Sequence, residues 1–304
     1  MGRTDISVIS RRKAAWKGRL ARVAVAMLLL APYASSQQAP EQIDLYLYPE
    51  DDGLNFRKLS ALAATSVVFT STLVHGYINW WEGNYQPFGF YDPVERGGWF
   101  EEPAILGMDK IGHLYGSYLA YTVQKAILEW GGYSPGTART LSASFAFGIG
   151  MLIELGDGFS DYSFDWRDLL MDAAGIFFGV AREEYPSLAH FNLKWSYVPD
   201  SWSMRVTKHY PSNIFWLTAD VGAMVRHDDG GPSLIQPAIG FSLTDDAMHR
   251  EFVFGIDFNL NSLLKSGNRE LEVIRKTIDV LHIPAPGIKI SGAYAPEYRA
   301  FVVD

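Results

Sequence analysis

The sequence predicts an α+β protein: an N-terminal membrane-associated helical bundle of about four helices, followed by a small antiparallel β-rich domain with one helix. In the first half, uncharged stretches of roughly helical length carry small residues at helical spacing. In the second half, apolar residues alternate with other residues at a period of two, which is typical of β-strands. A basic and then apolar N-terminus adds the expectation of export.

Composition and charge exclude several classes of protein. The chain of 304 residues is 48% hydrophobic, which excludes a disordered protein. Residues 37–304 contain 19 basic and 33 acidic side chains, a net charge of −14, which argues against binding to nucleic acid. The absence of cysteine excludes disulfides, thiolate metal sites, a thiol nucleophile and a lipid-modified N-terminal Cys.

Residues 1–36 have the pattern of a secretory signal peptide. Basic residues between Arg11 and Arg22 precede the apolar run Val23–Ala31, and the small residues Ala34–Ser36 follow. The signal can be cleaved or retained as an anchor, and a basic amphipathic helix lying on a membrane is the alternative. We interpret residues 37–58 as a linker.

A helical domain is expected at residues 59–185. The stretch Leu59–Ile78 carries no formal charge and has about the length of a membrane span. Residues 111–124 and 140–153 form shorter uncharged stretches, and residues 169–180 form a third that only Asp172 interrupts; all three suit half-buried or tilted helices. The alternative is a soluble all-α domain with a very apolar core.

Three polar blocks interrupt these helices. Asp109 and His113 are four residues apart near the start of the second helix and therefore share one face. Glu154 and Asp157 lie near the end of the third helix, and Asp165 is a candidate N-cap of the fourth. The candidate catalytic residues are Asp109, His113, Glu154, Asp157 and Asp168, and the candidate structural polar cluster comprises Lys110, Ser160, Asp165 and Asp172.

Three interpretations of these blocks stay open. A buried ion-pair network of Asp109, Lys110 and Asp168 would only fix the packing of the helices. A metal site would use His113 and carboxylates from the other blocks. A metal-free acid–base or proton-handling site is the third. Enzymatic activity, cofactor and metal are therefore left unknown.

The three blocks resemble the YfiM-like family of predicted periplasmic lipoproteins, the domain of unknown function DUF2279. Its D-K-x-G-H block matches Asp109–His113, its E-x-x-D-G-x-S block matches Glu154–Ser160, and its third block matches Phe164–Gly175. The order of polar residues is also distantly similar to VanZ-like membrane proteins. Asp172 stands where the family pattern leads us to expect Asn. The resemblance implies a location in the cell envelope and supplies no established activity.

The β-rich domain is expected at residues 213–304, after a linker at 186–212. We expect a helix over Leu271–Leu281, and an apolar face of the sheet covered by that helix or by the helical half. An outer-membrane barrel is the alternative, although five strands fall short of the eight that close one. The five predicted strands are Ile214–Val225, Ile235–Leu243, Glu251–Leu260, Gly287–Tyr294 and Tyr298–Val303.

Together these features predict an exported envelope protein on the periplasmic side, associated with a membrane and possessing a buried Asp/His/Glu cluster. The alternative is an envelope scaffold that binds a protein partner. We expect His113 at the centre of the cluster, with Asp109 serving one ring nitrogen. The other nitrogen needs an acid from across the bundle: Glu154, Asp157 or Asp168.

Overall fold

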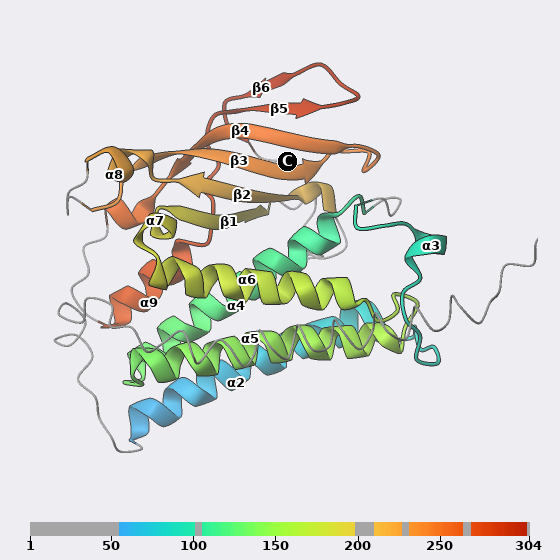
Figure 1. Ribbon diagram of the computed structural model, residues 1–304, viewed down its shortest axis with the longest axis horizontal. Coiled ribbons are helices and arrows are strands. Elements are labelled where there is room, and N and C mark those ends of the chain that lie inside the picture. Colours follow the sequence, from blue (N-terminus) through green and yellow to red (C-terminus); the bar gives the residue numbers. More distant parts are fainter. Residues whose placement is uncertain (1–54, 101–104, 198–209, 227–230, 264–268, 303–304) are drawn as a thin grey trace, which may run out of the picture. The chain divides into compact units, whose positions relative to one another are not determined.

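The computed structural model describes residues 55–100, 105–197, 210–226, 231–263 and 269–302, and these residues form an α+β fold (Figure 1). They contain eight α-helices and one six-stranded antiparallel sheet, all within one compact unit that spans residues 45–304. The predicted fold class is confirmed at this level. The predicted signal peptide lies outside the described residues.

Four long helices account for the apolar stretches of the first half. They are α2 (Phe56–Gly76), α4 (Met108–Trp130), α5 (Pro135–Gly158) and α6 (Trp166–Glu184), and a short π-helix, η2 (Tyr77–Trp81), continues α2. Side chains of Asn55, Ser134 and Asp165 cap α2, α5 and α6 by accepting hydrogen bonds from backbone amides, as polar N-caps do. The shorter helices are α3 (Pro93–Arg96), α7 (Pro186–Ala189), α8 (Val221–Arg226) and α9 (Arg269–Ile278).

Helix α4 is the central element, because it contacts α2, α5, α6 and α9. Its approach to α6 depends on Gly175, where a Cβ atom would lie 2.1 Å from the carbonyl oxygen of Leu114. Tyr121, Ala146 and Ile176 of α4, α5 and α6 form one small buried core. The predicted membrane-associated bundle of about four helices stays a prediction. Within the described residues, Phe56–Trp81 and Pro135–Gly158 are long and apolar enough to cross a membrane, a property that core helices of soluble proteins share.

The six strands follow one another in sequence order, and each pairs with the next in antiparallel fashion. Their bounds are β1 (Phe191–Tyr197), β2 (Asn213–Ala219), β3 (Ile235–Leu243), β4 (Arg250–Phe258), β5 (Gly287–Ser291) and β6 (Glu297–Arg299). Strand β1 lies inside the stretch predicted as a linker, so the sheet has six strands where we expected five. The strand predicted over Ile214–Val225 stops at Ala219, because the Asp220 side chain accepts a hydrogen bond from the amide of Ala223 and starts α8.

The two faces of the sheet are not buried as expected. Helix α4 covers the apolar face only near β1 and β2, where the Tyr115 and Phe215 rings lie 4.9 Å apart. From Leu217 of β2 to Tyr298 of β6 this face is exposed, and Phe254 in β4 is 47% exposed. Helix α9 packs on α4 instead. We call the exposed part the apolar sheet face; it consists of Leu217, Ile235, Ile239, Phe252, Phe254, Ile288, Ile290 and Tyr298.

The opposite face of the sheet is the buried one, although it carries charges. Lys194 and Asp257 pair there at 2.8 Å, and both are almost completely buried. The His282 ring stacks on Trp216 with a centroid distance of 3.9 Å. Trp216 belongs to a core cluster with Val302, so the segment after α9 and Val302 lie against this face.

Candidate functional site

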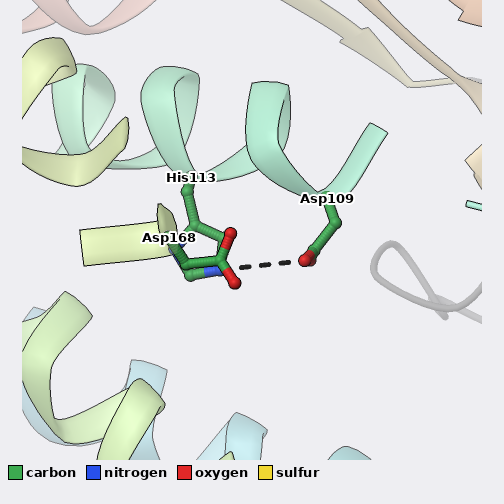
Figure 2. A group of neighbouring side chains, drawn as sticks. All are labelled: Asp109, His113 and Asp168. Carbon is green, nitrogen blue, oxygen red and sulfur yellow. Dashed lines mark ion pairs between the residues drawn. The ribbon is translucent and has the colours of Figure 1, made fainter. Parts of the chain in front are cut away.

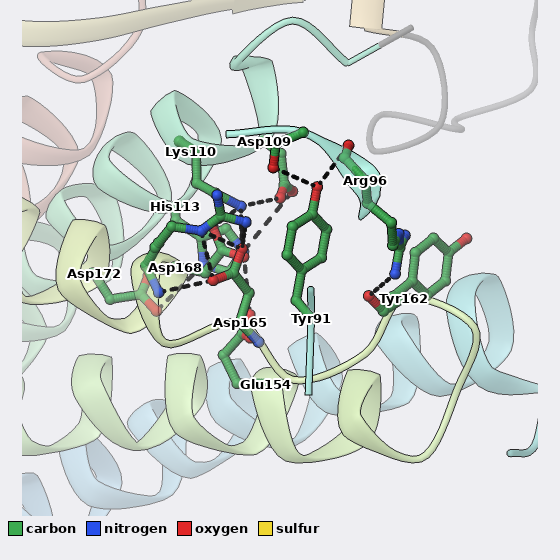
Figure 3. Close-up of polar contacts among 12 residues, drawn as sticks. Tyr91, Arg96, Asp109, Lys110, His113, Glu154, Tyr162, Asp165, Asp168 and Asp172 are labelled. Atoms are coloured by element: carbon green, nitrogen blue, oxygen red, sulfur yellow. Dashed lines mark hydrogen bonds and ion pairs between the residues drawn. The ribbon is translucent and has the colours of Figure 1, made fainter. Parts of the chain in front are cut away.

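His113 lies between three helices and is held by a carboxylate that comes from α6. Its Nδ1 atom is 3.2 Å from both carboxylate oxygens of Asp172 (Figure 3). Its Nε2 atom faces Glu154 Oε1 at 3.6 Å and Asp109 Oδ1 at 4.0 Å. Asp172 fits between the helices because α5 has a glycine at position 150, where a Cβ atom would lie 2.2 Å from Asp172 Oδ2.

A carboxylate from another helix lies within hydrogen-bond reach of His113, as predicted, but it belongs to Asp172 and not to one of the acids that we named. We expected Asp109 on one ring nitrogen and Glu154, Asp157 or Asp168 on the other, and we assigned Asp172 to the structural cluster. The shared helix face does bring Asp109 near the ring. The hydrogen-bonding carboxylate, however, comes from α6, because Gly150 leaves room for its side chain beside α5.

Lys110 anchors a second group of charges next to His113. Its Nζ atom lies 2.7 Å from Asp168 Oδ1, 2.9 Å from Asp165 Oδ2 and 3.1 Å from Asp109 Oδ2. Lys110 is only 3% exposed, so three carboxylates satisfy a charge that burial alone would make costly. Arg167 pairs with Asp165 at 2.6 Å and lies 4.4 Å from the centroid of the Tyr91 ring.

Sequence reasoning missed Arg167 and Tyr91. Arg167 stands between Asp165 and Asp168, two acids that the sequence had marked as candidates, and this position could have identified it. Tyr91 lies in a loop rich in Gly, Pro and aromatic residues, and its position gives no indication that its ring would meet Arg167.

The remaining predicted residues lie at the edge of the cluster. Glu154 Oε2 accepts a hydrogen bond from the backbone amide of Asp165 at 2.9 Å, whereas Oε1 has no hydrogen-bond partner among the described residues. Asp157 accepts a hydrogen bond from Trp81 Nε1 at 2.7 Å. Ser160 donates to the Asp157 carbonyl and accepts from the Tyr162 amide, so it shapes the turn after α5.

Burial and the crowding of acids change the proton affinity of the cluster. Burial opposes charge on His113, but Asp172, Asp168 and Asp109 outweigh this and raise the pKa of the imidazole well above its usual range. Burial raises the pKa of Asp168 to about 7 against the opposing effect of His113, and burial likewise raises that of Asp172. The surrounding acids also raise the pKa of Lys110 despite its burial.

Asp109, His113 and Asp168 are the described residues whose ligand atoms are close enough to share a metal ion (Figure 2). One atom from each lies within 4.8 Å of the others. The Lys110 ammonium already contacts the carboxylates of Asp109 and Asp168, where a divalent cation would need to bind. A metal would therefore have to displace a buried ion pair, and the charges fit a metal-free site better.

His113 also opens onto a groove of about 800 Å³ that runs along α4. Met108, Gly112 and Gly116 of α4 line it together with side chains from α2, α5 and the first two strands. The lining is mainly apolar. The carboxylates and the one imidazole among the described lining residues are those of Asp109, Asp157, Asp172 and His113, all at the end where the cluster lies.

Fold and site together define an α+β protein with a buried histidine–carboxylate cluster at the end of an apolar groove. Residues 96–184, which contain α4, α5, α6 and the whole cluster, match the model of DUF2279, a family described as predicted periplasmic lipoproteins. The resemblance to this family is thus confirmed for that segment, and the one to VanZ-like proteins is not shown. Comparison with curated proteins and with solved structures finds no match.

The family description supports a location in the periplasmic envelope. The 304 residues contain no cysteine, the residue that carries the lipid of bacterial lipoproteins. The family supplies no activity, so any function has to be argued from the site.

Proposed function

We propose that this chain is an exported envelope protein, associated with a membrane on the periplasmic side, in which His113 is an acid–base group acting on a substrate in the groove. The observation that carries the proposal is that His113 is both oriented by a buried carboxylate and open to the groove. A histidine that a second group orients and that borders a ligand site is the arrangement that proton transfer requires.

The cluster divides into two parts that support this assignment. All three carboxylates around Lys110 contact its ammonium, and Arg167 closes the far side of Asp165, as expected for charges that hold α4 to α6. His113 differs because its Nε2 atom has only longer contacts, at 3.6 and 4.0 Å. A purely structural histidine would be expected to have both nitrogens hydrogen-bonded.

Membrane association is supported by two separate surfaces. The continuous helix of α2 and η2 exposes Phe56, Val67 and Ile78, and the apolar sheet face exposes aromatic and branched aliphatic residues on strands β2 to β6. Soluble proteins rarely expose contiguous apolar patches of this kind. A scaffold that binds an envelope protein through the apolar sheet face is the alternative, and the Lys110 network favours a structural role for part of the cluster.

Complementation tests the acid–base role. In a host strain that lacks the chain, we expect His113→Gln to fail to restore growth under envelope stress while its abundance stays normal, because glutamine keeps a hydrogen bond to Asp172 and cannot transfer a proton. Asp161→Asn, which changes an exposed carboxylate in the loop before α6, is the matched control and should restore growth. Full restoration by His113→Gln would contradict the acid–base role and favour the scaffold.

A further inference from the structure

We infer that the groove binds the single aliphatic chain of an amphiphile and that its polar end selects a neutral or cationic head group over an anionic one. The inference rests on the proposed function, because it takes the groove as the substrate site. It adds the class of ligand, which neither the family description nor the cluster itself supplies.

The walls of the groove suit an aliphatic chain. Val68 of α2, Ile149 and Ile153 of α5 and Phe215 of β2 lie around it, and its volume is within the range of small-molecule sites. Gly116 of α4 lines it at a point where a Cβ atom would meet no described atom within 4 Å. The backbone of α4 is therefore accessible from the groove, and the space beside Gly116 is available to a ligand.

The groove is also continuous with an exposed apolar surface. Phe215 lines the groove and occupies the apolar side of β2, on the same side as Leu217. Direct cross-strand pairs then lead from Leu217 through Ile239, Phe254 and Ile288 to Tyr298. An aliphatic chain that arrives from a lipid phase would reach the groove along this row without passing a charged side chain. A water-soluble polar ligand would need no such apolar path.

Charge at the polar end determines the head group. None of the described residues that line the groove is Lys or Arg. Lys110 directs its ammonium toward Asp109, Asp165 and Asp168. The acids at this end are Asp109, Asp157 and Asp172, against the single imidazole of His113.

Asp109 is the acid that a head group would meet, because 33% of its side chain is exposed. A phosphate or carboxylate head would bring a negative charge beside these acids, whereas the positive charge of an ammonium head is attracted to them and a hydroxyl head can donate a hydrogen bond to them.

Quenching of the groove tryptophans, Trp80 and Trp195, measures binding. The full chain is kept in digitonin, which has no alkyl chain to occupy the groove, and is titrated with dodecyl probes that carry a terminal bromine. The probes differ only in their heads: trimethylammonium, hydroxyl or phosphate. We expect the ammonium probe to bind at least about tenfold more tightly than the phosphate probe, and Asp109→Asn to reduce that ratio.

Gly116→Leu tests the site, because it places a side chain in open groove space and a helix interior tolerates leucine better than glycine. It should weaken binding of the ammonium and hydroxyl probes by about tenfold or more. Gly136→Leu is the matched control. A Cβ atom at this glycine of α5 also meets nothing within 4 Å, and Gly136 is not among the residues that line the groove.

Several outcomes overturn the inference. One is a phosphate probe that binds as tightly as the ammonium probe, and another is unchanged binding to Gly116→Leu. A second copy of the chain in the groove would instead give no probe binding and a change of oligomeric state in Gly116→Leu. If binding fails in these ways while His113→Gln still fails to complement, the ligand class is wrong and the acid–base role stands.

Discussion

Two neighbouring residues of one helix show how position decides what a charged side chain can do. Lys110 and His113 are three positions apart on α4. The Lys110 ammonium pairs with three carboxylates at 2.7 to 3.1 Å, and the side chain is buried. The His113 side chain is 14% exposed and borders the groove. The same acidic surroundings therefore change the pKa of a group that a ligand can reach.

The Asp172 carboxylate should control the proton affinity of His113. Replacing it in Asp172→Asn keeps a hydrogen-bonding group near Nδ1 but removes the strongest of the charges that favour the imidazolium. We expect the pKa of His113 to fall by about 1 or more. A pH titration of the His113 ring signals by NMR in the full chain measures it.

Asp161→Asn serves as the control for this titration, because it removes an exposed acid that is not one of the described acids at the His113 ring, which are Asp109, Glu154 and Asp172. If the pKa of His113 is the same in Asp172→Asn as in the wild type, the Asp172 charge does not govern it. The variant also introduces the residue that the family resemblance leads us to expect at this position.

Periodicity and capping residues predict a helix or a strand correctly where one sequence pattern dominates the segment. The strand predicted over Ile235–Leu243 coincides with β3, and Asp165 caps α6 as predicted. Strand β1 has the same alternation in Phe191, Leu193 and Trp195, but its surroundings of Pro, Ser and charged residues led us to a linker. A single residue, Asp220, converts the end of the next predicted strand into a helix.

Within a helix, the sequence predicted which residues of the site are neighbours; between helices, it predicted that an acid would reach His113 but not which acid. The four-residue spacing placed Asp109 beside His113, because that relation is fixed by helix geometry. The bond from Asp172 depends on how α4, α5 and α6 pack, and therefore on Gly150 and Gly175, which no local pattern reveals. Alternation likewise separated the two faces of the sheet, but which face is buried is decided by what packs against it.

The apolar sheet face gives a prediction of its own. In Phe254→Lys we expect several-fold less chain in the membrane fraction after a high-salt wash, because a charge would enter the centre of this surface. The melting temperature should change by no more than about 2 °C, as for other exposed substitutions. Fractionation of cells and thermal melting in the same detergent measure the two effects.

Met248→Lys is the control for this variant, because Met248 is also exposed but lies in the turn between β3 and β4. A loss of several degrees in Phe254→Lys would mean that the face is part of a protein core. Recovery of the wild-type chain from the soluble fraction without detergent would contradict membrane association as a whole.

For the whole molecule, net charge limits how a membrane can be bound. The chain without its predicted signal peptide carries −14, so anionic lipid head groups repel it. Attraction must then come from apolar contacts, which salt does not screen. The high-salt wash is therefore a fitting condition, since it removes proteins held by charge and leaves those held by apolar surface.

The excess of buried acids should also set the pH dependence of stability. Asp168 has a pKa of about 7 in the folded chain, and the pKa values of Asp172 and His113 are raised as well. The folded chain therefore holds protons that the unfolded chain has released. Stability must then fall as pH rises from about 4, the usual carboxyl range, and must keep falling as His113 loses its proton.

We accordingly expect the melting temperature to be several degrees lower at about pH 8 than at about pH 5, at constant ionic strength. Carboxyls with lowered pKa values, such as Asp165 and Glu129, act in the opposite direction, but their effect is complete above about pH 5 and cannot reverse the slope. Asp168→Asn removes one of the proton-holding groups and should flatten the dependence, whereas Asp161→Asn should preserve it. A melting temperature that rises between about pH 5 and about pH 8 would show that the cluster is not proton-loaded in the folded chain, and the acid–base role of His113 would lose its electrostatic basis.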